Sequence, residues 1–348
     1  MSMRLPRWAA RLAARLRMAQ ALAAGRPFVW GLLLGAALLL TLLASLAVGA
    51  AQLSAADVPR ALLSSAHPLH ALLWQVRLPR IVTAALVGAA LAVAGALLQT
   101  VVRNPLADPS LIGVSAGAGV AALLGIVLLP EIAQLLPVLA FFGALASAGI
   151  VLLTAESGPA SKGPLRIILA GVAVQSILFA CIALITFLFA DRAPAFVAFT
   201  VGSLSGCGWR EARIVALPAV SGIALALLAA RPLDLLLLDD DSASGVGLGV
   251  RRTRVAVSCL AGLLAAGAVS VAGLVGFVGL VVPNWVRLLV GPEHARVLVL
   301  CALGGATLVV AADALARTVV APLELPVGAL LALLGGPYFL VILWRRVS

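Results

Sequence analysis

Two arginines, Arg77 and Arg80, stand three residues apart at the start of an apolar run. On a helix this spacing places both guanidinium groups on one face, and the rigid fork of N–H donors in arginine suits the recognition of carboxylates. A third arginine, Arg317, follows Asp313 by four residues, a spacing that favours an ion pair. Two interpretations stay open: the arginines anchor spans by extending their charges to the membrane surface, or they form a docking patch for a partner that carries carboxylates.

One motif in this sequence is also typical of serine hydrolases. Residues 113–117, Gly-Val-Ser-Ala-Gly, match the G-x-S-x-G pattern, but that pattern needs a parallel sheet and a histidine base. The apolar spans described below leave no room for such a sheet. The three histidines, which we expect in loops, are His67, His70 and His294. We therefore exclude a serine hydrolase.

The sequence excludes ATP hydrolysis by a P-loop in this chain, and it lacks the usual coupling group of a secondary transporter. The single lysine, Lys162, lies in Ala-Ser-Lys-Gly rather than in the G-x-x-x-x-G-K-[ST] loop that holds ATP phosphates. No acidic residue is expected in mid-span, where a charge costs roughly 2.5–3.5 kcal/mol and persists for functions such as proton coupling. The four cysteines lack paired spacing, so we expect neither a disulfide nor a metal site. The chain is predicted not to be an enzyme, to hold no cofactor stably, and to depend on ATP-Mg hydrolysed in another subunit.

The composition is that of a membrane protein. Of 348 residues, 63% are hydrophobic and 11% are charged, and the mean hydropathy is +1.18. Stretches of about 20 residues can cross the hydrocarbon core as helices. Such stretches occur near residues 28–50, 81–102, 111–129, 132–154, 167–189, 213–230, 255–272, 274–290, 297–316 and 326–344. We predict an all-α polytopic fold with about ten transmembrane helices in a single domain, residues 28–348. The 255–290 block has no charge before Arg287, so its division near residues 271–276 rests on length and glycines.

Positive charges predict the orientation, because lysine and arginine are retained on the cytoplasmic side. With the N-terminus inside, most of the 24 lysine and arginine residues fall in inner segments. Those left outside are Arg60, Arg77, Arg80, Arg192, Arg210, Arg213 and Arg317. Both termini and the 231–254 loop are therefore expected in the cytoplasm. The basic segment at residues 1–27 has arginines at helical spacing and is expected either to lie on the anionic inner leaflet or to form a basic tail.

Two polar segments interrupt the apolar pattern. The first is a turn between two spans, and its polar and proline residues are Arg103, Asn104, Pro105, Asp108 and Pro109. Non-helical backbone at membrane depth has to be buried in protein or to line a cavity. The second is the 231–254 loop, whose leucines need a surface to pack on and whose Asp239 resembles a helix start. We predict a pair of short cytoplasmic helices that dock a soluble partner, and the alternative is a self-folded cap.

Six ordered motifs resemble those of one permease family. They are Arg77-Leu-Pro-Arg80, Arg103-Asn-Pro-Leu-Ala-Asp-Pro109, Leu111-Ile-Gly-Val-Ser-Ala-Gly117, Gly276-Phe-Val-Gly-Leu-Val-Val-Pro283, Ala312-Asp-Ala-Leu-Ala-Arg317 and Glu324-Leu-Pro-Val-Gly328. Collinear over about residues 55 to 345, they resemble the permeases of bacterial ABC importers for vitamin B12, iron-siderophores and haem. The resemblance implies a type II importer permease of the inner membrane: a ten-helix subunit that forms a homodimer around the path. It also implies two cytoplasmic ATPase subunits and a periplasmic binding protein.

The resemblance also implies roles for individual residues. Arg77, Arg80 and Arg317 match the arginines that meet glutamates of the binding protein. The loop matches the helices that couple the permease to the ATPase, with Leu235, Leu238, Asp239, Asp240, Ser242, Ala243, Leu248 and Gly249 as contact residues. One departure is Asn284, where the family usually has histidine after Pro283.

The substrate is the least determined property. The C-terminal stretch, with residues 315–328 and Leu334-Gly-Gly-Pro-Tyr-Phe-Leu340, looks most like haem permeases, which favours haem import and iron uptake. A ferric siderophore and a corrinoid are the alternatives within the family. A secondary transporter, a channel and a membrane enzyme are the competing classes.

Overall fold

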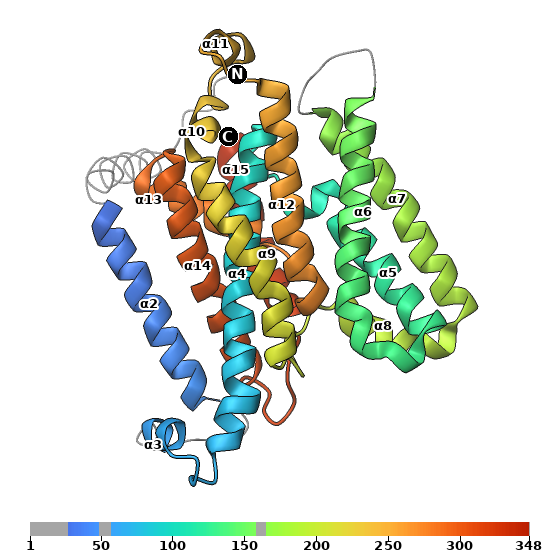
Figure 1. The fold of residues 1–348 in the computed structure, drawn as a ribbon, viewed down its shortest axis with the longest axis vertical. Coiled ribbons are helices and arrows are strands. Elements are labelled where there is room, and N and C mark those ends of the chain that lie inside the picture. The colour runs from blue at the N-terminus through green and yellow to red at the C-terminus, as the bar shows by residue number, and fades with distance from the viewer. Residues whose placement is uncertain (1–26, 49–56, 158–164, 348) are drawn as a thin grey trace.

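The computed structural model describes residues 27–48, 57–157 and 165–347. The predicted basic segment, residues 1–27, lies outside the described residues except for Pro27. The described part is a bundle of helices without strands (Figure 1). Its long helices are α2 (Pro27–Ala47), α4 (Leu78–Val102), α5 (Val114–Leu128), α6 (Leu136–Glu156), α7 (Leu165–Leu188), α9 (Trp209–Leu228), α12 (Val250–Ala272), α13 (Val278–Val290), α14 (His294–Ala316) and α15 (Val327–Val347).

Each of these helices coincides with one predicted span. Among the described residues, seven helices are long and apolar enough to cross a membrane, and α5, α13 and the first part of α15 are shorter apolar helices. The predicted division of the 255–290 block is confirmed, because α12 ends at Ala272 and α13 begins at Val278. Between them Gly273 and Phe277 both have a φ of 67°, which breaks the helix. The all-α polytopic fold is therefore confirmed.

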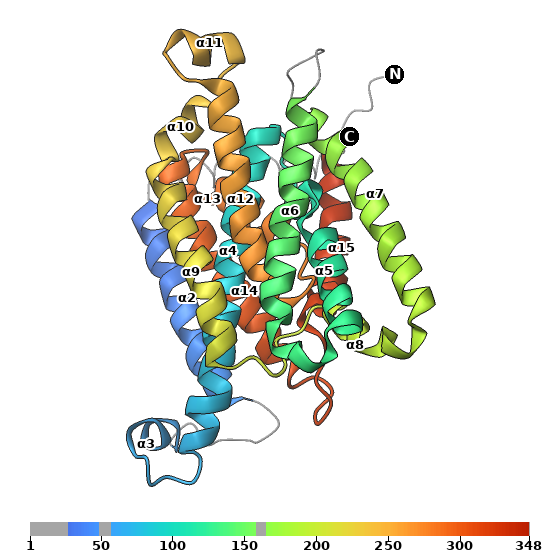
Figure 2. The same cartoon turned by 45° about the vertical axis from the view of Figure 1, so that its right-hand side comes forward.

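Short helices lie between the long ones. They are α3 (Asp57–Leu63), η1 (Leu72–Arg77), η2 (Pro109–Ile112), η3 (Pro130–Leu135), η4 (Ala190–Arg192), α8 (Ala193–Thr200), α10 (Ala230–Leu235) and α11 (Asp240–Gly245). The predicted pair of short helices in the 231–254 loop is present as α10 and α11. These two lie at one end of the bundle and α3 lies at the opposite end, in both views (Figures 1 and 2). We call these the coupling end and the α3 end.

Helix α4 is the centre of the bundle. The most apolar stretch of η1 and α4 is 83% buried, against 6% for α7 and 11% for α2. α4 packs against α14, α12, α9 and α13, and all of these surround it in Figure 1. α2 and α7 lie on opposite flanks (Figure 1). Exposed apolar side chains on α2 and α7, such as Phe28 and Phe187, are typical of surfaces that face lipid or another subunit.

Glycines bring α4 into direct backbone contact with its neighbours. A Cβ on Gly88 would lie 2.1 Å from the carbonyl oxygen of Gly305 on α14. A Cβ on Gly95 would lie 1.9 Å from the carbonyl oxygen of Gly279 on α13. In lipid, no hydrophobic force separates helices from acyl tails, so such close approaches supply the packing energy that holds helices together.

We predict that Gly88→Ala destabilises the bundle by about 1–3 kcal/mol, because the added methyl group overpacks the α4–α14 contact. The matched control is Gly149→Ala on α6, where a Cβ would meet nothing within 4 Å. Thermal unfolding in lipid nanodiscs should show a lowered midpoint for Gly88→Ala alone. Equal midpoints for the two variants would contradict this packing.

Candidate functional site

The predicted docking arginines meet in one buried cluster at the α3 end. Arg77 ends η1, Arg80 lies in the first turn of α4, and Arg317 follows α14. Their exposed fractions are 5%, 7% and 5%. An arrangement in which these side chains extend to the membrane surface is therefore wrong for all three.

One carboxylate serves two of these arginines. Arg80 donates from Nη2 to Asp313 Oδ1 at 2.9 Å, and Arg317 forms an ion pair with Asp313, with its Nε 3.1 Å from Oδ2. Asp313 itself is 1% exposed. The predicted Asp313–Arg317 ion pair is confirmed, while the bond from Arg80 brings in a helix more than 200 residues earlier in the chain. Because buried charges need charged partners, these contacts hold α4 to α14.

Two of the three arginines, Arg77 and Arg317, bind the end of α2. Arg77 donates to the carbonyl oxygen of Leu46, and Arg317 donates to the carbonyl oxygens of Ser45 and Val48. The last carbonyl groups of a helix have no intrahelical partners, and positive charge is favourable there. The cluster therefore caps α2 and joins it to α4 and α14.

Glu324 is the member of the cluster that reaches the surface. Its side chain is 35% exposed, and it accepts a hydrogen bond from Arg80 Nη1 at 2.8 Å. Burial alone would raise the pKa of Glu324, but the hydrogen bond and the charge of Arg80 outweigh it and lower the pKa. Glu324 is thus ionised at neutral pH, and it is the group of this cluster that a partner would meet first.

At the coupling end, Arg103 holds the loop that contains α10 and α11. Arg103 ends α4 in the left-handed region, with a φ of 52°. Its guanidinium group donates to the carbonyl oxygens of Leu236 and Leu238 and forms an ion pair with Asp240 at 2.8 Å. Arg103 therefore does more than form the turn that the sequence predicts, since it attaches the coupling loop to α4.

The start of α11 is fixed by charge. Asp239 accepts a hydrogen bond from the backbone N–H of Ser242 at 2.9 Å, which caps the helix and lowers the pKa of Asp239. Asp240 accepts two hydrogen bonds from Arg254, at 2.6 and 2.9 Å. These bonds, with the charges of Arg254 and Arg103, lower the pKa of Asp240. Both carboxylates are therefore ionised at neutral pH.

The predicted coupling residues divide into buried and exposed groups. Ala243 is fully buried, and Leu235, Asp240 and Leu248 are half-buried. The remaining predicted residues, which are exposed, are Leu238, Asp239, Ser242 and Gly249. The sequence analysis missed Leu237 and Val246, which are 48% and 63% exposed. Their exposure, with that of Leu238, gives the coupling end an apolar surface.

The predicted polar turn after α4 is held from inside the bundle. Asn104 Oδ1 accepts from the backbone N–H of Leu106, and Asp108 Oδ1 accepts from the backbone N–H of Ser110 at the start of η2. Asn284 on α13 donates to the carbonyl oxygen of Pro105 at 2.8 Å. Pro109, also in the predicted turn, is buried. The amide at position 284 therefore fastens the turn to α13.

The structure corrects the predicted location of His294. We expected it in a loop, but it is the first residue of α14 and is 0% exposed. Its ring lies between Asp234 of α10 and Thr100 of α4. Neither partner was identified from the sequence, because the three residues lie far apart in the chain.

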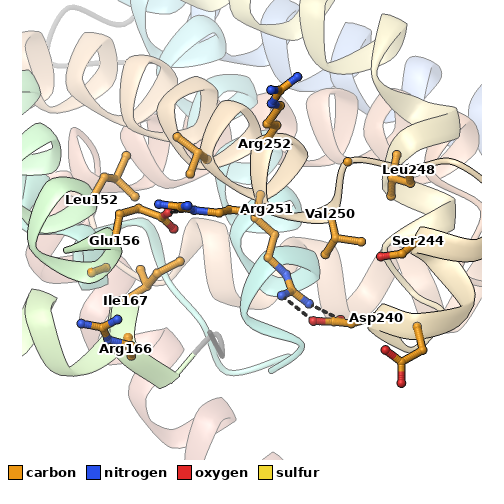
Figure 3. A pocket seen from close by; sticks show the side chains of 15 residues that line it. Leu152, Glu156, Arg166, Ile167, Asp240, Ser244, Leu248, Val250, Arg251 and Arg252 are labelled. Carbon is orange, nitrogen blue, oxygen red and sulfur yellow. Dashed lines mark hydrogen bonds and ion pairs between the residues drawn. The ribbon is translucent and has the colours of Figure 1, made fainter. Parts of the chain in front are cut away.

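A pocket lined by both charged and apolar residues borders the coupling loop (Figure 3). It has a volume of about 670 Å³ and is lined by residues of α6, α7, α11 and α12. The side chains of Arg251 and Glu156 point toward each other across one wall and form an ion pair (Figure 3). Three predicted coupling residues also line it, namely Asp240, Leu248 and Gly249. The pocket is a recess in the surface of the coupling end.

Comparison with known proteins decides the family. The FecCD transport family matches residues 37–345. The chain belongs to the FecCD family of type II ABC importer permeases. The hemin transport system permease HmuU of Yersinia pestis is 39% identical over 317 residues, which are 88% of this chain and 94% of HmuU. The Fe(3+) dicitrate permease FecD of Escherichia coli is 40% identical over 294 residues, 82% of this chain and 90% of FecD.

A solved structure agrees with the fold. An inward-facing structure of a transporter of the metal-chelate type has a TM-score of 0.81 and 30% identity, and the match covers 90% of this chain and 98% of that one. FecCD permeases are membrane subunits that work with ATPase subunits and a binding protein. This chain is therefore a multi-pass membrane subunit of an ABC importer.

We predict that Asp313→Ala destabilises this FecCD permease by about 3–5 kcal/mol, because it leaves two buried arginines without their shared carboxylate. The matched control is Asp191→Ala, since Asp191 pairs with Arg192 on the surface and exposed pairs contribute about 0–1 kcal/mol. The amount of folded protein in membranes and the unfolding midpoint should fall for Asp313→Ala only. A normal midpoint for Asp313→Ala would contradict the role of the cluster.

Proposed function

We propose that this chain moves haem from the periplasm to the cytoplasm, powered by ATP that two separate ATPase subunits hydrolyse. The observation that favours haem as the substrate is the match to HmuU, which extends over 94% of that permease. The physical chemistry agrees with this proposal. Haem is a flat and largely apolar ring, and a passage of mostly apolar side chains with few charges allows transit without retention.

A ferric siderophore is the second candidate. FecD, an Fe(3+) dicitrate permease, is as similar in identity as HmuU, although its match covers less of this chain. A corrinoid is the third candidate, since the motifs resemble those of vitamin B12 permeases and the cobalamin permease BtuC of Halobacterium salinarum is 40% identical over 272 residues. A binding protein that selects the substrate before it reaches the permease would allow closely related permeases to serve different substrates.

The proposed ATPase contact is the surface of α10 and α11. Leu237, Leu238 and Val246 expose apolar area there, and large apolar side chains at the centre of an interface contribute most of its binding energy. Arg103 and Arg254 hold the loop rigidly beneath this surface through Asp240. A rigid apolar surface loses little conformational entropy when it binds a partner.

The proposed oligomer is a homodimer with the path between the two copies, in the inner membrane. The α3 end faces the periplasm in this arrangement, and both termini face the cytoplasm. Arg77, Arg80 and Arg317 remain our proposed docking residues for the binding protein. Because Arg80 already pairs with Glu324, a glutamate of the binding protein would have to join or replace that exposed carboxylate.

We predict that Leu238→Asp weakens binding of the ATPase by about 2 kcal/mol or more, because it places a charge in the apolar contact. Leu63→Asp is the matched control, since Leu63 is 89% exposed on α3 at the opposite end. Co-purification of the ATPase with each variant measures the effect. Full recovery of an active complex with Leu238→Asp would overturn the proposed contact.

We predict that proteoliposomes with the complete complex accumulate haem only when ATP and a haem-loaded binding protein are both present. Ferric siderophore, loaded on the same binding protein, is the matched substrate control. Accumulation measured by haem absorbance should depend on the ATPase. Transport of the siderophore but not of haem would replace our proposal by the second candidate.

A further inference from the structure

His294 lies buried between the coupling loop and the central helix. Its Nδ1 is 2.7 Å from Asp234 Oδ1 on α10, and its Nε2 is 2.7 Å from Thr100 Oγ1 in the last turn of α4. A neutral imidazole donates from one nitrogen and accepts at the other. With its proton on Nδ1, His294 donates to Asp234 and accepts from the Thr100 hydroxyl. The ring thus joins α10 to α4 by one continuous chain of hydrogen bonds.

Asp234 makes a second bond to the same residue. The backbone N–H of His294 donates to Asp234 Oδ1 at 2.9 Å. The first N–H groups of a helix have no intrahelical partners, and negative charge is favourable at a helix N-terminus. Asp234, on α10, therefore caps the N-terminus of α14. The backbone N–H and the Nδ1–H of His294 together fix the position of the Asp234 carboxylate.

Thr100, the other partner of the His294 ring, is itself held by contacts with α4 and α13. It is 3% exposed, and its Oγ1 accepts from Nη2 of Arg287 on α13 at 3.4 Å. The single hydroxyl proton goes to His294 and so does not serve the carbonyl oxygen of Ala96, 2.9 Å away. Arg287 donates to that carbonyl oxygen at 3.1 Å and also donates to Gln99. The Gln99 amide donates in turn to the carbonyl oxygen of Gly279. The hydrogen-bond chain from α10 thus ends in a network that spans α4 and α13.

The contacts of α10 show why this link matters. α10 is six residues long and contacts α14 and α9. Leu233 is fully buried and Leu236 is 1% exposed, so apolar packing holds the segment against the bundle. Apolar packing is non-directional, whereas the bonds of Asp234 specify position and direction. The link therefore fixes where α10 lies relative to α4.

We propose that His294 is the positioning residue that transmits movement of the coupling helix α10 to α4. Displacement of α10 by the ATPase then passes to the central helix and is not lost within the loop. This inference rests on the proposed function, in which α10 and α11 contact the ATPase.

The test uses Thr100→Val and Thr100→Ser in the complete complex with its ATPase and binding protein. Valine keeps the shape of threonine and removes the hydroxyl group, while serine keeps the hydroxyl group. A second pair, Asp234→Ala and Asp234→Asn, applies the same logic at the other end, because both bonds of Asp234 use Oδ1, which the amide oxygen of asparagine can replace. These pairs leave the buried imidazole in place.

Two readouts are expected to change together. Amide hydrogen exchange over α10 should be about fivefold faster in Thr100→Val and Asp234→Ala, the factor that corresponds to one lost hydrogen bond. Stimulation of the ATPase by the substrate-loaded binding protein should fall by about fivefold. Thr100→Ser and Asp234→Asn should restore both readouts.

Native exchange over α10 in Thr100→Val and Asp234→Ala would overturn the inference, since no link would exist. Faster exchange with unchanged ATPase stimulation would also overturn it, because the link would then be structural only. A wild-type complex without stimulation would overturn the proposed function, and the inference with it, whereas either of the first two results leaves the proposed function intact.

Discussion

An arginine that is buried inside a membrane bundle must find partners for its charge within the protein. Arg80 on the central helix α4 is such a residue, and the bundle is arranged around this constraint. Near the start of α4, Arg80 pairs with Asp313 and Glu324. At its end, Arg103 pairs with Asp240. Between these ends, glycine contacts bring α14 and α13 against its backbone.

The two ends of α4 differ in what they hold. At the α3 end, Asp313 binds α4 to a long helix, and Arg317 extends the cluster to α2, so the contacts connect parts of the rigid bundle. At the coupling end, Arg103 and the bonded pair of His294 and Asp234 connect the bundle to short helices with exposed leucines. The first arrangement stabilises the fold. The second places an exposed apolar surface on a firm support, and this is the surface that we propose as the ATPase contact.

The sequence predicted those features that depend on neighbouring residues. Spans, the break between α12 and α13, the short helices of the coupling loop and the Asp313–Arg317 pair follow from local hydropathy, length, caps and helical spacing. Burial of Arg77, Arg80 and Arg317 was not predicted, because it depends on contacts with α2 and α14 that only the folded chain brings together. His294 was placed in a loop for the same reason, since its partners Thr100 and Asp234 are remote in sequence. A polar residue at the edge of a span thus indicates a polar contact, but a partner on another helix cannot be predicted from spacing.

The central claim is that the coupling end faces the cytoplasm and the α3 end faces the periplasm. Single-cysteine labelling with a membrane-impermeant maleimide tests it directly, in a background from which Cys181, Cys207, Cys259 and Cys301 have been removed. The test positions are Val246→Cys beside α11 and Leu63→Cys on α3, both exposed. Our account predicts labelling of Leu63→Cys in intact spheroplasts and labelling of Val246→Cys only after the membrane is opened. Labelling of Val246→Cys from outside would contradict the account.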